Sequence, residues 1–143
     1  MVWSKLLLMT ISVPKNIVLK YTEEKGWGVY ARRYIKKGSL IERCYCIQVS
    51  NNTNTTPDEL MDYVFNYPIN AEKNKENHVL PLGYGSVYNH SNNPNANWRH
   101  CELPMVFDFY SLKDIKKGEE ICTYYGDIYW DFKKKREVGI KYY

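Results

Sequence analysis

The chain has 143 residues, which suffices for one domain with a real core but not for two domains of ordinary size. Charged residues make up 25% of the sequence, aromatic residues 15%, and tyrosine occurs 14 times. This composition excludes a disordered tail and a membrane protein, and it predicts one Tyr-rich globular domain over residues 1–143.

The first predicted elements are short strands. The apolar run 5–11 is too short to cross a bilayer, and no small-residue cleavage site follows it. A strand is therefore favoured there over a membrane anchor or a signal peptide. Residues 17–21 are also predicted to form a strand.

Residues 39–49 alternate between two sets of side chains, which is the period-2 pattern of a strand. Cys44 and Cys46 share one face of this strand. A zinc site that joins them to His100 and Cys101 would have spacings that match no structural zinc pattern. We therefore expect reduced, mostly buried thiols, no bound metal and a reducing intracellular compartment. The two alternating sets are Ile41, Tyr45, Ile47, Val49 and Glu42, Cys44, Cys46, Gln48.

A helix is predicted next, because helix-start signals precede an apolar pattern. Thr56 is the expected N-cap and Pro57 the first helical residue, with apolar residues up to Phe65 on one face. Pro68 would end the helix. The polar stretch 66–77 is predicted to be a loop that faces solvent or substrate.

Two segments of the chain are similar in sequence and share an IKKG turn. ARRYIKKGSLIE spans residues 31–42, and YSLKDIKKGEEIC begins at residue 110. Gly38 and Gly118 supply the positive φ that such turns need. Each copy is thus predicted to be a strand, a turn and a strand, and the two copies to contribute similar hairpins. A further strand is predicted over residues 105–112.

Three motifs stand out beside this pattern: GWGVYA at 26–31, NHSNNPN at 89–95 and GEEICTYYGDIYW at 118–130. In this order they resemble the SET domain of protein lysine methyltransferases. The resemblance covers about residues 15–131, which leaves 132–143 as a basic tail. It is strongest to short stand-alone SET proteins of the large-DNA-virus type.

The resemblance implies a mostly β fold, the SET-domain or β-clip fold. This fold consists of small sheets and hairpins with one or two short helices. Its C-terminal strand would thread under the segment that holds Asn89 and His90 and form a pseudoknot. Asn92 stands where the family often has cysteine, and Tyr124 where it commonly has aspartate.

The resemblance also implies a site with two halves. S-adenosylmethionine would lie in one cleft, and the substrate lysine would enter from the opposite face through an aromatic channel. The catalytic residues would be Tyr125 and Tyr63. The substrate would contact Tyr63 and Tyr129. The residues that would bind the cofactor are Gly26, Trp27, Gly28, Asn89, His90, Tyr125 and Trp130.

The chemistry explains why such residues are needed. A lysine with a pKa near ~10.4 must lose a proton before it attacks a methyl sulfonium, which costs about 4–5 kcal/mol at pH 7. Burial in an aromatic channel beside the sulfonium lowers that pKa, since both effects disfavour the ammonium. Tyrosine offers a rigid apolar wall and a hydroxyl that orients the amine. We expect Tyr125 to serve this role, and His90 to serve the cofactor and the knot.

The leading hypothesis is therefore a protein lysine methyltransferase that acts on a histone tail. Two alternatives stay open: a small basic module that binds nucleic acid through its net charge of +4, and an inactive SET fold that binds partners. A homodimer and a nuclear location, in a host cell if the protein is viral, are further options. Possible DNA contacts or a nuclear signal are Lys133, Lys134, Lys135 and Arg136. A substrate-facing acidic rim is expected from Asp58, Glu59, Asp62, Glu72 and Glu76.

Overall fold

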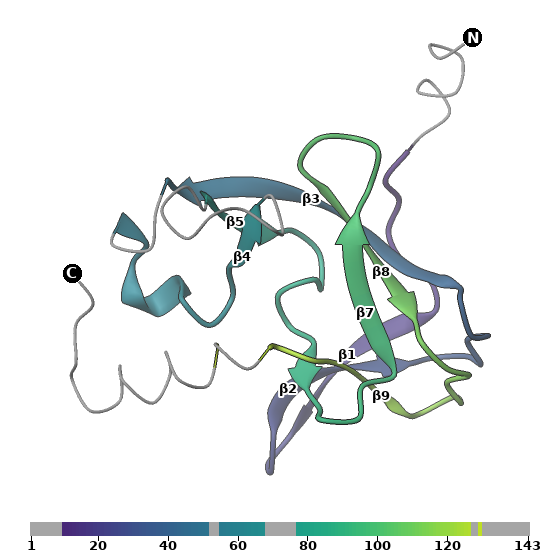
Figure 1. Cartoon of the computed structure of the whole chain (residues 1–143). Coiled ribbons are helices and arrows are strands. Elements are labelled where there is room, and N and C mark those ends of the chain that lie inside the picture. The colour runs from purple at the N-terminus through teal and green to yellow at the C-terminus, as the bar shows by residue number, and fades with distance from the viewer. Residues whose placement is uncertain (1–9, 52–54, 68–76, 127–128, 130–143) are drawn as a thin grey trace, which may run out of the picture.

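The computed structural model describes residues 10–51, 55–67, 77–126 and 129 (Figure 1). Strands dominate these residues, as the sequence predicted, and the helical content is small. The elements in chain order are β1 (Ile17–Thr22), β2 (Gly26–Ala31), β3 (Leu40–Ser50), the 3-10 helix η2 (Asp58–Leu60), β4 (Phe65–Tyr67), β5 (Asn77–Pro81), β6 (Asn89–His90), β7 (Ala96–His100), β8 (Val106–Ser111) and β9 (Glu120–Thr123).

The strands form two sheets. One has the order β1-β2-β9-β6, in which β6 and β9 are parallel and the other neighbours antiparallel. The other has the antiparallel order β4-β5-β3-β8-β7. The long strand β3 pairs with β8 through its first half and with β5 through its second half. Apolar side chains from both sheets make one core, which includes Ile17, Val29, Val79, Phe107, Phe109 and Ile121.

The alternation predicted for β3 is present from Cys44 to Ile47, but there the more apolar set faces outward, whereas Ile41 of the same set is buried before the register shift at Leu40–Glu42. Tyr45 and Ile47 are 50% and 41% exposed, whereas Cys44 and Cys46 are buried at 1% and 0%. Close packing explains the choice, because a Cβ at Gly85 would lie 3.0 Å from the Cys44 Sγ. Only a small side chain therefore fits at position 44. All four cysteines are free thiols, and Cys101 and Cys122 are half-buried.

The two IKKG segments have the predicted turns but are not hairpins. Gly38 and Gly118 have φ of +82° and +88°. Each copy pairs its strands with those of the other copy, so that β2 lies against β9 and β3 against β8. Ile35 and Ile115 join the two turns through a pair of 2.8 Å backbone hydrogen bonds. The repeat therefore ties the two sheets together.

The prediction of a helix after Thr56 is wrong except for the single 3-10 turn η2. Pro57 precedes η2 with a ψ of 137°, and no side chain caps the turn. Thr56 instead lies 2.6 Å from the Nδ1 of buried His78, which removes it from the capping role. Phe65 belongs to β4, where it pairs with Val79. Tertiary pairing thus overrides the local helix signals.

Strand β9 is held against the NHSNNPN segment, as the expected pseudoknot requires. It lies between β2 and β6 (Figure 1). The Asn95 side chain donates to the Glu120 carbonyl at 2.8 Å and accepts from the Cys122 amide at 2.9 Å. The Ser91 amide donates to the Thr123 carbonyl. Side chain and backbone together fasten the end of the domain to the middle of the chain.

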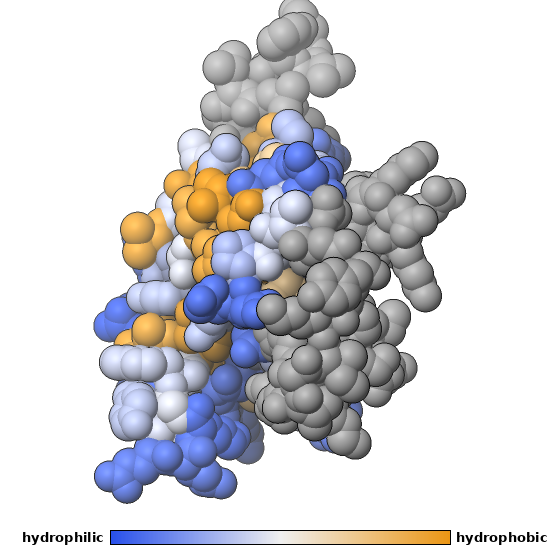
Figure 2. Space-filling view, turned by 90° about the vertical axis from the view of Figure 1, so that its left-hand side faces the viewer, coloured by the Kyte–Doolittle hydropathy of each residue, from blue (hydrophilic) through white to orange (hydrophobic). Residues whose placement is uncertain are grey.

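The surface mixes apolar and charged regions. Figure 2 shows apolar residues in several groups on one face and a hydrophilic lower end. The strand predicted at 5–11 lies mostly outside the described residues, and Ile11 at its end is 45% exposed and not in a strand. Within the described part of the chain, no helix is long and apolar enough to span a membrane.

Candidate functional site

One cavity of about 540 Å³ opens beside the end of β9. This volume falls within the range of about 300–1,000 Å³ that is usual for sites of small ligands. Its walls come from segments far apart in the sequence: the β1–β2 turn, the stretch after η2, the segment that leads into β6, and the residues after β9. The lining residues are Lys25, Trp27, Asp62, Tyr63, Ser86, Val87, Asn89, His90, Tyr125 and Tyr129.

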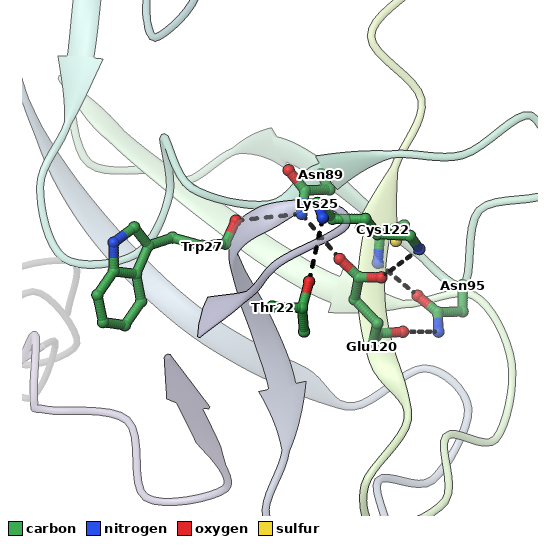
Figure 3. A network of polar contacts seen from close by, with 7 residues as sticks. All are labelled: Thr22, Lys25, Trp27, Asn89, Asn95, Glu120 and Cys122. Carbon is green, nitrogen blue, oxygen red and sulfur yellow. Dashed lines mark hydrogen bonds and ion pairs between the residues drawn. The ribbon is translucent and has the colours of Figure 1, made fainter. Parts of the chain in front are cut away.

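Asn89 forms one corner of this cavity together with Gly28 and Glu120. Its side-chain amide donates to the Trp27 carbonyl at 3.1 Å and to the Glu120 Oε1 at 2.8 Å (Figure 3). A Cβ at Gly28 would lie 2.8 Å from that Oε1 and 2.9 Å from the Asn89 nitrogen. Only glycine therefore allows the three segments to meet.

Glu120 also carries an ion pair that sequence reasoning missed. Its Oε2 lies 2.7 Å from the Lys25 Nζ, and Lys25 is anchored at the backbone by Thr22 (Figure 3). The hydrogen bond and charge of Glu120 raise the pKa of Lys25, so the ammonium is maintained at the cavity wall. The doubled glutamate of the GEE motif was visible in the sequence, but nothing local indicated that its second member turns toward the β1–β2 turn.

Tyr125 occupies the centre of the wall. Its hydroxyl donates to the Tyr88 carbonyl at 2.5 Å, and its ring meets the Tyr129 ring edge-on at 4.9 Å. Burial, supported by neighbouring acidic groups, raises the pKa of Tyr125 to about 12. The phenol is therefore protonated at neutral pH, and its proton is directed at a fixed carbonyl.

His90 contacts the same residue from the backbone side. Its Nδ1 accepts the Tyr125 amide N–H at 3.1 Å, and its Nε2 lies 2.9 Å from the Asn92 Oδ1. Because Nδ1 is an acceptor here, the proton belongs on Nε2, which donates to Asn92. Asn92, at the position where the family often has cysteine, thus fixes the tautomer of His90. This geometry suits a residue that places Tyr125.

Further aromatic residues beside Tyr125, together with an acidic edge, complete the lining. Tyr63 is 48% exposed, and its carbonyl accepts a 2.8 Å bond from the Ser86 hydroxyl. The Tyr129 hydroxyl donates to Asp62 at 2.9 Å. Of the expected acidic rim, Asp62 lines the cavity, while Asp58 and Glu59 lie exposed on η2. The remaining members, Glu72 and Glu76, lie outside the described residues.

The structure brings most of the predicted site residues to one cavity. Those predicted for the cofactor and those predicted for the lysine line the same space. Gly26 and Gly28 shape the adjoining turn and do not line it. Trp130 and the basic tail 133–136 lie outside the described residues. The wall residues that sequence reasoning missed are Lys25, Ser86 and Val87.

The cysteines do not line the cavity, although Cys122 is close enough to contribute to the raised pKa of Tyr125. Burial raises the pKa of Cys46 to about 12 and that of Cys122 to about 11, so both are thiols at neutral pH. Over the described ranges, no group of three or more His, Cys, Asp or Glu side chains is placed to hold a metal ion.

Comparison with known proteins identifies this architecture. The family model described as the SET domain matches residues 26–126. The chain belongs to the SET-domain family. The match includes all three motifs up to Gly126, both IKKG turns and every described strand except β1.

Two relatives extend the comparison. A Schizosaccharomyces pombe protein named histone-lysine N-methyltransferase, H3 lysine-37 specific, is 30% identical over 115 residues, which are 78% of this chain and 74% of the relative. A crystal structure of a candidate histone methyltransferase of Plasmodium falciparum has 32% identity and a TM-score of 0.66. That alignment covers 82% of this chain and 99% of the Plasmodium chain.

Proposed function

We propose that this protein transfers a methyl group from S-adenosylmethionine to the ε-amine of a lysine in a protein, with histones as the substrate class. The observation that carries the proposal is one cavity, in a SET domain, that is lined both by Trp27 and Asn89 and by the aromatic residues Tyr63, Tyr125 and Tyr129. The names of the relatives support histones as the class.

The residues present fit the cofactor. The exposed indole of Trp27 offers a flat apolar surface, and the polar corner at Asn89 can hold the amino-acid part of the molecule. The Lys25 ammonium, which is paired with Glu120, has further N–H donors that could bind a carboxylate. When bound, S-adenosylmethionine supplies an electrophilic methyl group on a sulfonium. Gly26, Gly28, His90 and Trp130 complete the proposed binding set.

The aromatic wall fits a lysine. Tyr63 and Tyr129 would confine the apolar side chain and exclude water. Tyr125 would orient the amine: its own proton is directed at the Tyr88 carbonyl, so its oxygen can accept a hydrogen bond from the amine N–H. Confinement among rings disfavours the ammonium and lowers the pKa of the substrate lysine.

The chemistry that the bound cofactor would supply is displacement of its methyl group by the neutral amine, with the bonding electrons left on sulfur. The substrate ammonium would first have released its proton to solvent, and Tyr125 would then hold the amine in line with the methyl group. The protein therefore contributes mainly positioning, desolvation and the retention of a neutral amine. No general base from His90 is required, which agrees with the use of its Nδ1 by the Tyr125 amide.

Further features of the proposal rest on the sequence. We place the protein among SET proteins of the viral type, with residues 1–143 as one domain. The basic residues 133–136 would contact DNA, the enzyme would work in a nucleus within a reducing cell interior, and a homodimer is the proposed assembly. A nucleic-acid-binding module without catalysis is the competing function, because the net charge is +4.

The experiment is a methyl-transfer assay with radiolabelled cofactor on core histones, paired with calorimetry of cofactor binding. We expect micromolar or tighter binding and label on histone lysines. Binding without transfer to histones or to a cell lysate would indicate the inactive SET fold. Absence of binding together with tight association with DNA would support the nucleic-acid module.

A further inference from the structure

A buried carboxylate lies behind the catalytic wall and does not itself line the cavity. Glu42 on β3 is 4% exposed. Its Oε1 accepts a 2.8 Å bond from the Tyr88 hydroxyl, and its Oε2 accepts a 3.1 Å bond from the Tyr84 amide. A buried charge persists only when its oxygens are satisfied in this way.

The same Tyr88 holds Tyr125 from its other side. Its side chain is 1% exposed and its ring stacks on Phe109 at 4.8 Å with an interplanar angle of 19°. Its hydroxyl is bound to Glu42 and its backbone carbonyl accepts the Tyr125 hydroxyl. One residue therefore links a core carboxylate to the hydroxyl that faces the amine.

The segment 83–88 packs closely around the Glu42 side chain. Gly83 has a φ of +80°, and a Cβ there would lie 2.7 Å from the Glu42 Oε2. The same segment supplies Ser86 and Val87 to the cavity wall. Glu42 thus fixes the segment at the Tyr84 amide and again at the Tyr88 side chain, on either side of the wall residues.

Electrostatics favour the observed direction of the bonds. Burial raises the pKa of Glu42 above its ordinary value, and the bonds from Tyr84 and Tyr88 offset only part of that rise. Burial and the nearby carboxylate raise the pKa of Tyr88 well above its ordinary value, so the phenol stays protonated and donates. Glu42 is consequently the acceptor and Tyr88 the donor.

We infer that Glu42 is a positioning residue for methyl transfer, which acts through the Tyr88 side chain to fix the carbonyl that orients the Tyr125 hydroxyl. The inference rests on the proposed function and deepens it. Because the Tyr125 hydroxyl would act mainly in the transition state, loss of the link should lower kcat and leave cofactor affinity and peptide KM nearly unchanged.

The test is Tyr88→Phe, which removes one hydroxyl and keeps the ring and the carbonyl. We expect kcat to fall about tenfold, equivalent to ~1.4 kcal/mol of transition-state stabilisation, with cofactor Kd and peptide KM within about twofold of wild type. Glu42→Gln should retain most of the rate, because its amide can accept from Tyr84 and donate to Tyr88. Tyr110→Phe on β8, whose ring contacts Arg99, is the matched control and should be unchanged.

A second variant and a second readout keep the inference testable. If Tyr88→Phe does not fold, a double variant with Glu42→Met and Tyr88→Phe removes the buried carboxylate together with the hydroxyl that binds it. Only the Tyr84 amide then loses its acceptor, and the variant should fold with the same loss of kcat. Aromatic-carbon relaxation dispersion of Tyr125 should show new exchange in either variant, whether or not the substrate is correct. Wild-type kcat and an unchanged Tyr125 signal would overturn the inference. Wild-type inactivity on every lysine substrate would overturn the proposed function instead.

Discussion

At the scale of single residues, the Tyr125 hydroxyl carries the strongest mechanistic claim. Tyr125→Phe removes the oxygen that would orient the amine, and its ring still fills the wall. We expect methyl transfer to fall by about 10²–10³, the range for loss of one transition-state hydrogen bond, with cofactor affinity retained. Single-turnover rates and calorimetry measure the two effects.

The neighbouring Tyr124 is the control for that change, because it is 41% exposed and its ring also contacts His90. Tyr124→Phe should keep wild-type turnover. The roles assigned to these residues would be reversed by the following result: Tyr125→Phe is fully active, whereas His90→Gln has no activity although its fold and cofactor affinity are intact.

Gly28 makes a second prediction at this scale. Gly28→Ala puts a methyl group against both Glu120 and Asn89, so the corner must open. We expect cofactor Kd to rise about tenfold or more, a cost of ~1.4 kcal/mol.

Gly118→Ala is the comparison for Gly28→Ala, because its cost is backbone strain at φ +88° with nothing within 4 Å of the added methyl. It should lower the melting temperature and leave cofactor Kd unchanged. Equal Kd values for Gly28→Ala and wild type would show that the Asn89 corner does not hold the cofactor.

At the scale of elements, the β3–β5 pair contains a buried histidine that predicts acid sensitivity. His78 is 4% exposed, and it bonds to Thr56, which in turn bonds to Ser50. Burial lowers the pKa of His78 below its ordinary value. Its stabilising contribution is therefore complete above about pH 6.5 and is lost as the pH falls through the lowered pKa, because the unfolded chain binds the proton first.

Thermal melts of wild type and His78→Gln between about pH 7.5 and pH 5 measure this effect. The wild type should lose more stability toward acid than the variant, since the carboxylates are common to both. Parallel melting curves would mean that His78 is not the acid-sensitive group.

The sequence predicted those elements that depend on residues close together in the chain. The glycine turns at Gly38 and Gly118 and the alternation of β3 follow from rules of short range. The helix failed because Phe65 gains a partner in Val79, 14 residues later. The sequence did not predict that Cys44 and Cys46 would be the buried face of β3, because this depends on how closely Gly85 approaches the strand.

The same distinction between local and long-range information applies to the candidate site. The motifs located Asn89, His90 and Tyr125, whose spacing in sequence is itself the signal. The pairings of Glu42 with Tyr88 and of Lys25 with Glu120 span 46 and 95 residues and leave no local pattern. Such contacts emerge only from the folded chain.

At the scale of the whole molecule, charge should govern the encounter with substrate. The protein is basic at +4, so a basic histone tail needs a local acidic surface. Asp58 and Glu59 supply one at η2, beside the wall that holds Tyr63. Asp58→Lys with Glu59→Lys should raise peptide KM several-fold at low salt and spare cofactor Kd.

Glu102→Lys, in the loop between β7 and β8, makes a single charge reversal of the same kind and should leave peptide KM unaltered. The effect of the η2 reversal should also shrink as salt is added. If peptide KM does not change when the two η2 charges are reversed, the substrate binds to another surface.

The last prediction concerns metals. We expect activity and the melting temperature to be unchanged after dialysis against EDTA, because the cysteine spacings match no zinc site. Circular dichroism before and after chelation measures the fold. Unfolding in EDTA would reveal a structural metal that the sequence pattern does not disclose.

The exchange of strands between the two IKKG segments has a consequence for synthesis on the ribosome. Strand β2 has left the exit tunnel long before its partner β9 is made, about 90 residues later in the pairing of Val29 with Ile121. Until then, the β1–β2 turn, Asn89 and Tyr125 have no common scaffold. A nascent chain that stops before residue 120 therefore lacks both Glu120 and Tyr125, so the cavity forms only after β9 and the residues that follow it have been made.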